Sequence, residues 1–152
     1  MRAHPTVRLA AILSHAVNEV EVEVEEHGAV RGPISGAACA YCEYSRARRH
    51  DTGGGELWET YESGTVGSRM VRVHDASGHG WVDLEGAEFV LPERRLRSPR
   101  TERWIERRLD VGERLYVLGI ARRKPPADGE SAREAAGEPV FAPDPAVPLV
   151  VR

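Results

Sequence analysis

Cys39 and Cys42 are the two cysteines of the chain, and their C-x-x-C spacing occurs in metal sites and in redox-active pairs. A Cys2His2 zinc site would be completed by His74 and His79, whose H-x4-H spacing lies in the usual range. Both thiols reach one ion only if the backbone turns between them, because residues i and i+3 of a strand point to opposite faces. No glycine lies between them, so we expect two buried structural side chains and no bound cofactor.

Other catalytic arrangements are incomplete. A thioredoxin-like pair needs its first cysteine at a helix N-terminus, whereas residues 37–44 form the nearly continuous apolar run of a buried strand. Ser35 lies in P-I-S-G, which is not the G-x-S-x-G turn of a hydrolase nucleophile. The glycines of 53–55 lack the Lys and Ser/Thr of a phosphate-binding loop. We therefore predict that the protein is not an enzyme.

The size and net charge of the chain restrict its domain number and the kinds of partner that it can bind. The 152 residues fit one domain, predicted over 5–142, followed by a proline-rich tail at 143–152 that we expect to be loosely held. Twenty-one basic against 24 acidic residues give a net charge of −3, which disfavours nucleic-acid binding. Neither a signal peptide nor an apolar stretch of transmembrane length is apparent, so we expect a cytoplasmic location, either free or peripheral to a membrane.

Two clusters of arginine make nucleic-acid binding an alternative function. The first cluster is Arg46, Arg48 and Arg49, and the second is Arg94, Arg95, Arg97, Arg100, Arg103, Arg107 and Arg108. If both clusters share a face with aromatic residues, an OB-like domain could bind single strands by charge neutralisation and stacking. Glutamates interleave the second cluster, which indicates solvated ion pairs instead. The arginines retained as possible interaction residues are Arg46, Arg48, Arg49, Arg103 and Arg107.

Short strands are predicted along most of the chain. The strict alternation of N-E-V-E-V-E-V-E-E at 18–26 indicates a strand with Val20, Val22 and Val24 inside. Further strands are predicted at 37–46 and 57–63, joined by an exposed hairpin tip, and on both sides of the Ser77–Gly80 turn. The last strands are predicted after Gly112 and at the P-V-F-A-P of 139–143. Apolar spacing predicts helices at 5–17 and near 99–110.

Alternating strands that bury one face must close or be covered. We therefore predict a mainly β (α+β) fold, a small antiparallel, OB-like, partly open barrel with a short N-terminal helix and one later helix. The order of the strands cannot be read from one sequence.

Four segments in register resemble the GIDE domain, also called the "beside a membrane" (BAM) domain, of mitochondrial E3 ubiquitin ligases and prokaryotic relatives. They are P-T-V-R-L-A-A-I-L-S-H-A-V-N-E-V-E-V-E-V, P-I-S-G-A-A-C-A-Y-C-E-Y-S, V-H-D-A-S-G-H-G-W-V-D-L-E-G-A-E-F and T-E-R-W-I-E-R-R-L-D-V-G-E-R-L-Y-V-L-G-I-A-R-R. The resemblance spans about residues 5–142 and implies structural roles, in turns, a buried strand and a strand bend, for Pro33, Ser35, Gly36, Cys39, Tyr41, Asp83, Gly86, Gly112 and Gly119.

The chain lacks the family's RING and its flanking transmembrane helices. Ligase chemistry runs through the RING, so the resemblance implies a recognition module for a protein or peptide partner, with no transferase activity. That partner would belong to a soluble or a membrane-associated complex. A small zinc or redox protein built on the C-x-x-C pair is the second alternative. The oligomeric state does not follow from the sequence.

Overall fold

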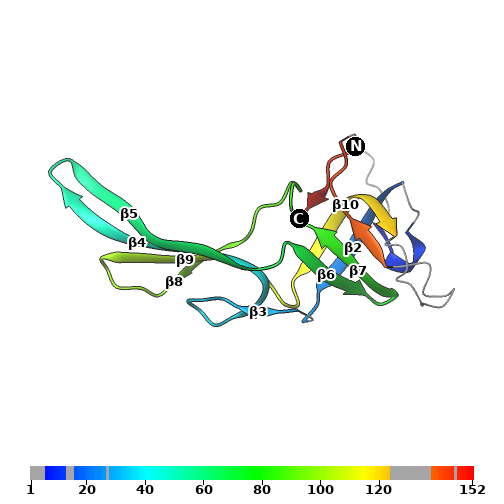
Figure 1. Cartoon of the computed structure of the whole chain (residues 1–152), viewed down its shortest axis with the longest axis horizontal. Helices are drawn as coiled ribbons and strands as arrows, with labels where there is room; N and C mark the ends of the chain where they lie inside the picture. Colours follow the sequence, from blue (N-terminus) through cyan, green and yellow to red (C-terminus); the bar gives the residue numbers. More distant parts are fainter. Residues whose placement is uncertain (1–5, 13–15, 27, 124–137, 146) are drawn as a thin grey trace.

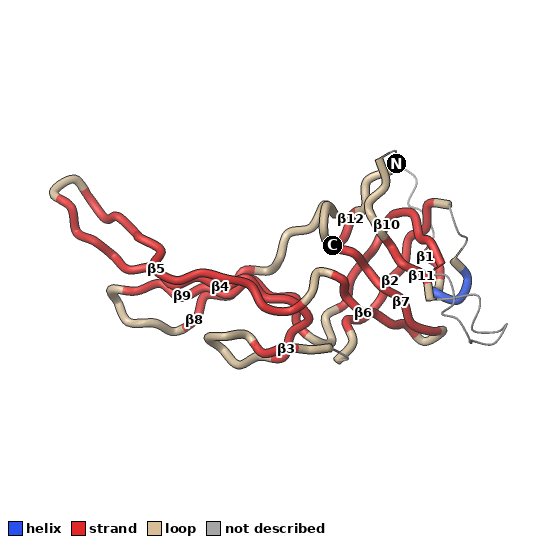
Figure 2. Tube along the Cα trace, in the orientation of Figure 1, coloured by secondary structure: helices blue, strands red, loops and turns tan. Residues whose placement is uncertain are grey.

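The computed structural model describes residues 6–12, 16–26, 28–123, 138–145 and 147–152. They form a β-barrel that carries both ends of the described chain and a long β-sheet arm that extends away from it (Figure 1). Almost every regular element is a strand (Figure 2). The prediction of a mainly β, OB-like barrel is therefore confirmed, although the barrel is closed and not partly open, because β10 (Arg114–Arg123) pairs with β2 (Val17–Val24).

Five strands close the barrel in the order β2-β6-β7-β11-β10 and back to β2. The β7–β11 contact is parallel and the other contacts are antiparallel. Two short strands, β1 and β12, attach to the outside of this ring at β2 and β10. The bounds of these strands are β1 Thr6–Val7, β2 Val17–Val24, β6 Met70–Asp75, β7 Gly78–Asp83, β10 Arg114–Arg123, β11 Pro139–Phe141 and β12 Val150–Val151.

The barrel encloses an apolar core that the alternation of β2 predicted correctly. Val20, Val22 and Val24 are at most 2 % exposed, while the glutamates between them face outward. Phe141 and Leu149 reach this core from the C-terminal end of the chain. The hydrophobic effect of burying these side chains closes the ring.

Two insertions into the barrel build the arm. The first leaves β2 and returns at β6, and the second leaves β7 and returns at β10. In the arm, β4 lies between β9 on one side and β3 and β5 on the other, and β8 forms the edge beyond β9. The arm strands are β3 Val30–Arg31, β4 Ala38–Thr52, β5 Gly55–Gly67, β8 Glu93–Leu96 and β9 Glu102–Asp110.

The helix predicted near 99–110 is wrong, because this segment is strand β9. The apolar residues of this segment fit both the period of a helix, 3.6 residues, and the period of a strand, two residues. As a strand it places Trp104 on one face and Ile105 and Leu109 on the other, and β4 and β8 satisfy its backbone from both sides. Tertiary pairing thus overrides a weak helical pattern.

The helix predicted at 5–17 is also wrong over most of its described length. Thr6–Val7 pair with β2 as a parallel strand, and only Leu9–Ala11 form a turn of 3-10 helix. Residues 13–15 of that prediction lie outside the described part of the chain. Leu9 is nevertheless buried, so its apolar side chain does face the core.

Two loop predictions change as well. The predicted hairpin tip at 46–56 shrinks to Gly53–Gly54, because β4 and β5 stay paired out to Thr52 and Gly55. The proline-rich tail is not loosely held at its end. Leu149 is 1 % exposed, and β12 pairs with β10.

Candidate functional site

The cysteines lie on β4 at the base of the arm, and their predicted orientation is wrong. A β-bulge at Ala40 shifts the register against β9 between Cys39 and Tyr41. A bulge inserts one residue and breaks the alternation of faces, so Cys39 and Cys42 point the same way. The side chain of Cys42 is close enough to interact with the Cys39 thiol.

Both thiols are fully buried, and their surroundings favour the protonated form. Burial raises the pKa of Cys42 to about 12, and the nearby Glu106 carboxylate adds to this effect. Burial, followed by Asp110, also raises the pKa of Cys39, while Arg108 partly opposes the shift. Thiols with raised pKa values are poor nucleophiles, because the thiolate is the reactive form. The pair therefore has the chemistry of packing residues.

The P-I-S-G turn closes over a buried carboxylate in the same region. Glu106 of β9 is 0 % exposed and accepts hydrogen bonds from the backbone N–H groups of Ile34 (2.8 Å) and Ser35 (3.1 Å). The Ser35 hydroxyl donates a further hydrogen bond to Glu106 Oε1. Burial alone raises the pKa of Glu106, but these hydrogen bonds outweigh it and hold the pKa below the ordinary value. Ser35 therefore has a structural role.

Arg108 completes this cluster of Ser35, Glu106, Arg108 and Asp110. Its Nη1 lies 2.7 Å from Glu106 Oε1, and its Nε lies 2.8 Å from Asp110 Oδ1. Hydrogen bonds to Asp110 raise the pKa of Arg108 despite its burial, so it stays charged. A buried ion pair with this many partners fixes the packing of β9 under the turn.

The two histidines of the zinc hypothesis lie on the barrel. His74 of β6 and His79 of β7 are cross-strand partners, and their ring centroids are 6.1 Å apart. Both contact Glu25, whose Oε1 is 3.4 Å from His74 Nδ1. Within the described ranges, no three His, Cys, Asp or Glu side chains are arranged to hold a metal ion. The structure does not bring the predicted Cys2His2 set together.

The glycines of the GIDE resemblance have the predicted geometric roles. Gly36, Gly86 and Gly112 have φ values of 75°, 78° and 84°, a region that disfavours other residues. At Gly119, a β-carbon would lie 2.7 Å from Leu149 Cδ1, so the Leu149 side chain packs closely against this glycine.

The other signature residues are also structural. Pro33 belongs to the turn over Glu106, and Tyr41 is 6 % exposed. The Asp83 carboxylate accepts a hydrogen bond from the Glu85 N–H and caps the turn after β7.

The arginines predicted as interaction residues lie along the arm, and each already contacts an aromatic ring or a carboxylate of the same chain. Arg46, Arg48 and Arg103 stack on Trp104, Tyr61 and Trp58 at 4.9, 4.8 and 4.2 Å from the ring centroids. These cation–π contacts cover one face of each aromatic ring.

The two remaining predicted arginines form ion pairs. Arg49 lies 3.3 Å from Glu56, and Arg107 lies 2.9 Å from Glu93. The Arg107–Glu93 pair is an exposed ion pair of the kind that the interleaved glutamates of the second cluster indicated.

A pocket of about 270 Å³ opens where the arm joins the barrel, and the sequence did not indicate it. Its apolar wall comes from residues 84–91, and its polar wall includes Arg69, which stacks on Tyr41 and pairs with Glu43 at 3.1 Å. Val90, 88 % exposed, forms part of its rim. These residues come from distant segments, so only the fold reveals the pocket.

The longest free strand edge in the described structure is that of β5. In the described structure this 13-residue strand pairs with β4 alone, and it runs along the arm in solvent (Figure 1). An edge strand presents unpaired backbone N–H and C=O groups to any extended chain. Its acidic side chains Glu56, Glu59 and Glu62 are 61 %, 67 % and 45 % exposed.

No helix in the described residues is long and apolar enough to cross a membrane. Comparison with known proteins identifies no matching family model, no matching curated protein and no matching solved structure.

Proposed function

We propose that this protein is a non-catalytic interaction module, resembling the GIDE domain, that binds an extended segment of a protein partner along β5. The observation that carries the proposal is the length of the free edge. An added strand of comparable length would gain main-chain hydrogen bonds over much of the arm. The bulge at Tyr61 interrupts the edge once, which leaves residues 56–60 as a regular stretch.

The charge of β5 specifies the partner. The strand contains three glutamates and no basic residue. Their ion pairs with β4 are exposed, so they leave the edge negative toward solvent. A partner segment with alternating Lys or Arg side chains therefore fits best, because opposite charges directly across a strand pair stabilise it.

The absence of catalysis is part of the same proposal. The candidate nucleophiles Cys39 and Cys42 are buried and have raised pKa values. The Ser35 hydroxyl donates a hydrogen bond to the carboxylate under its turn. The proposal also places the domain in the cytoplasm, with a partner in a soluble complex or one beside a membrane. A ubiquitin-transfer activity is not part of the proposal.

Fluorescence anisotropy with a labelled octapeptide of alternating Lys and Val tests the edge. We expect saturable binding that decreases at least about tenfold in the Glu59→Arg/Glu62→Arg variant. The matched control is Glu26→Arg, which reverses an exposed charge on the barrel side. Equal binding of an alternating Glu-Val peptide, or equal binding by the charge-reversed variant, would refute the proposal.

Single-stranded nucleic acid is the second candidate, favoured by the aromatic side chains along the arm. Binding through phosphates must weaken steeply with salt. Titration of a labelled 20-nucleotide single strand at 20 mM and 150 mM salt separates the two candidates. No binding at the lower salt eliminates the nucleic-acid function.

A further inference from the structure

We infer that the segment which the acidic β5 edge accepts is the basic β8 edge of a second copy of this chain. The inference rests on the proposed function, because it names the occupant of the same edge. β8 forms the opposite edge of the arm sheet, where it pairs only with β9 among the described strands. Each copy therefore has one edge of each kind.

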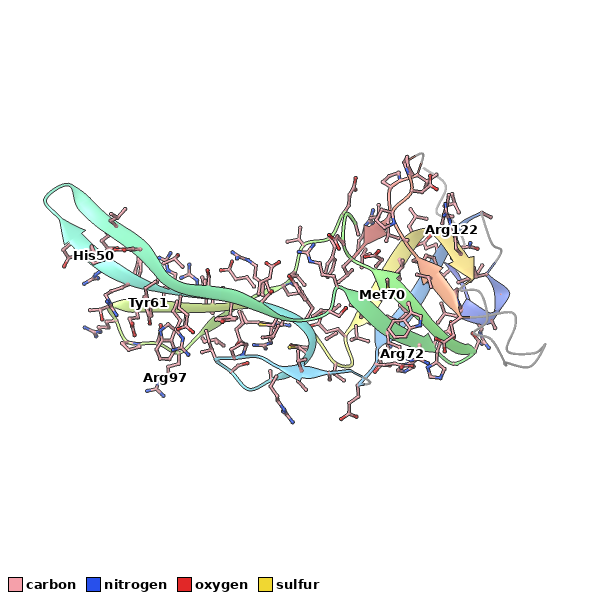
Figure 3. All side chains as sticks on the ribbon, in the orientation of Figure 1. His50, Tyr61, Met70, Arg72, Arg97 and Arg122 are labelled. Carbon is pink, nitrogen blue, oxygen red and sulfur yellow. The ribbon has the colours of Figure 1, made fainter. Side chains whose placement is uncertain are left out.

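The two edges have opposite charges. β5 contains three glutamates and no basic residue, whereas residues 93–101 contain four arginines and one glutamate. All four of these arginines are exposed, and Arg97 points away from the arm (Figure 3). In the described structure, Arg97 and Arg100 have no ion-pair partner. This stretch is therefore a basic extended segment of the kind that β5 is proposed to bind.

The strand directions are compatible with edge-to-edge pairing. β5 and β9 each run antiparallel to β4, and β8 runs antiparallel to β9. β5 and β8 of one sheet are therefore antiparallel to each other. A second copy stacked in the same orientation places its β8 antiparallel to β5, which continues the sheet.

One register makes opposite residues complementary on the first face of the sheet. Placing Leu57 opposite Leu96 also places Glu59 opposite Arg94. In a single copy, Leu57 and Glu59 pair with residues of β4 that are two apart and therefore share one face of the sheet. Leu96 and Arg94 pair with residues of β9 whose own partners on β4 lie on that same face. Leu57 is 57 % exposed, so this contact buries an apolar side chain that is otherwise in water.

The same register is complementary on the second face. Trp58 then lies opposite Arg95, whose only ion pair in the described structure is a 3.9 Å contact with Glu93. Glu56 lies opposite Arg97. An arginine beside an indole ring contributes a cation–π contact, and a Glu–Arg pair contributes a cross-strand ion pair. A slip by one residue would place each of these side chains on the wrong face.

The register also determines how the copies are arranged. Leu96 is level with Arg46 of β4, and Leu57 is level with His50. The second copy is therefore displaced along the arm by four residues, roughly 13 Å at about 3.3 Å per residue. Sheet twist of about 20° per strand turns the neighbouring barrels apart. The interface is heterologous, so association produces chains of copies and not a closed dimer.

Intermolecular disulfide formation tests the register. Leu57→Cys protein mixed with Leu96→Cys protein should form a covalent dimer under air oxidation. Leu57→Cys mixed with Arg95→Cys is the matched control and should cross-link at least about tenfold less, because those residues face opposite sides. Equal cross-linking of the two mixtures would overturn the register.

Sedimentation velocity with charge-reversed variants tests the association itself. We expect wild-type protein to associate with increasing concentration and to dissociate at 0.5 M salt. Glu59→Arg and Arg94→Glu should each weaken association, and an equimolar mixture of the two variants should restore it. Thermal melting verifies that both variants are folded.

A wild-type protein that stays monomeric at all concentrations overturns this inference. If the Lys-Val peptide still binds β5 in that case, the proposed function stands and only the occupant is wrong. If neither the peptide nor a second copy binds, both the inference and the proposed function fail.

Discussion

The Ser35 hydroxyl donates a hydrogen bond to the Glu106 carboxylate, although 71 residues separate them in the chain. Ser35 belongs to the turn before β4, and Glu106 belongs to β9 on the far side of that strand. The contact therefore closes the base of the arm. Arg108, whose Nη1 also lies 3.1 Å from Ser35 Oγ, links the same turn to Asp110.

Replacing the buried carboxylate should be costly. We expect Glu106→Gln to lower the free energy of unfolding by about 3–5 kcal/mol, because it removes one of the two carboxylates paired with the buried Arg108 and the charge to which the N–H groups of the turn donate. Urea denaturation followed by circular dichroism measures the change. Glu62→Gln is the control, since that exposed side chain pairs with Arg46 at 3.7 Å and should change stability by less than about 1 kcal/mol. Equal effects of both substitutions would contradict the burial argument.

Stability should depend on the titration of Glu106. Its pKa in the folded protein is lower than the ordinary value of 4.5. A lowered pKa means that the stabilisation is fully present above the pKa of the unfolded chain and is lost as the pH falls through the folded pKa. Unfolding free energies of wild type and Glu106→Gln, measured from pH 7 to pH 3, should therefore converge below about pH 4.5. A difference that stays constant over this range would contradict the prediction.

The two thiols should be unreactive in the folded protein. With the pKa of Cys42 at about 12, little thiolate is present at pH 8, and burial limits access further. We expect Ellman's reagent to modify the native protein at least about 100-fold more slowly than the chain in guanidinium chloride. Fast labelling of native protein would restore a redox or nucleophilic role for the pair.

Gly67 should not tolerate alanine. Its φ is 86°, and a β-carbon there would overlap the backbone carbonyl oxygen of Ala40, the residue inserted at the bulge. We expect Gly67→Ala to destabilise the protein by about 3 kcal/mol or more, through left-handed strain and a backbone clash together. Gly28→Ala isolates the left-handed strain, because Gly28 has a φ of 75° and open space around it. We expect this substitution to destabilise the protein by about 1–2 kcal/mol. Thermal denaturation of both variants measures the difference, and equal losses would exclude the clash.

Local patterns predicted the barrel strands because burial of one face imposes a period of two. The valines of β2 and the turn between β6 and β7 carry that information in adjacent residues. Positive φ values explain Gly36, Gly86 and Gly112 in the same local way, whereas Gly119 is explained by the side chain of Leu149, which is remote in sequence. The glutamates that interleave the second arginine cluster likewise predicted ion pairs such as that of Arg107 with Glu93.

Tertiary structure alone decided three features. Trp104, Ile105 and Leu109 fit a helix or a strand, and the choice depended on pairing with β8, which closely precedes β9 in the chain, and with β4, which is remote in sequence. The orientation of Cys39 and Cys42 depended on one inserted residue at a bulge.

The arm itself is the third feature, because its sheet is assembled from two separate insertions. The sequence determined that this chain makes short amphipathic strands around an apolar core, since each strand's burial pattern is local. Which strand edges remain free depends on long-range pairing, and only the folded structure shows that β5 and β8 are the longer open edges of the described arm, beside the two-residue β3.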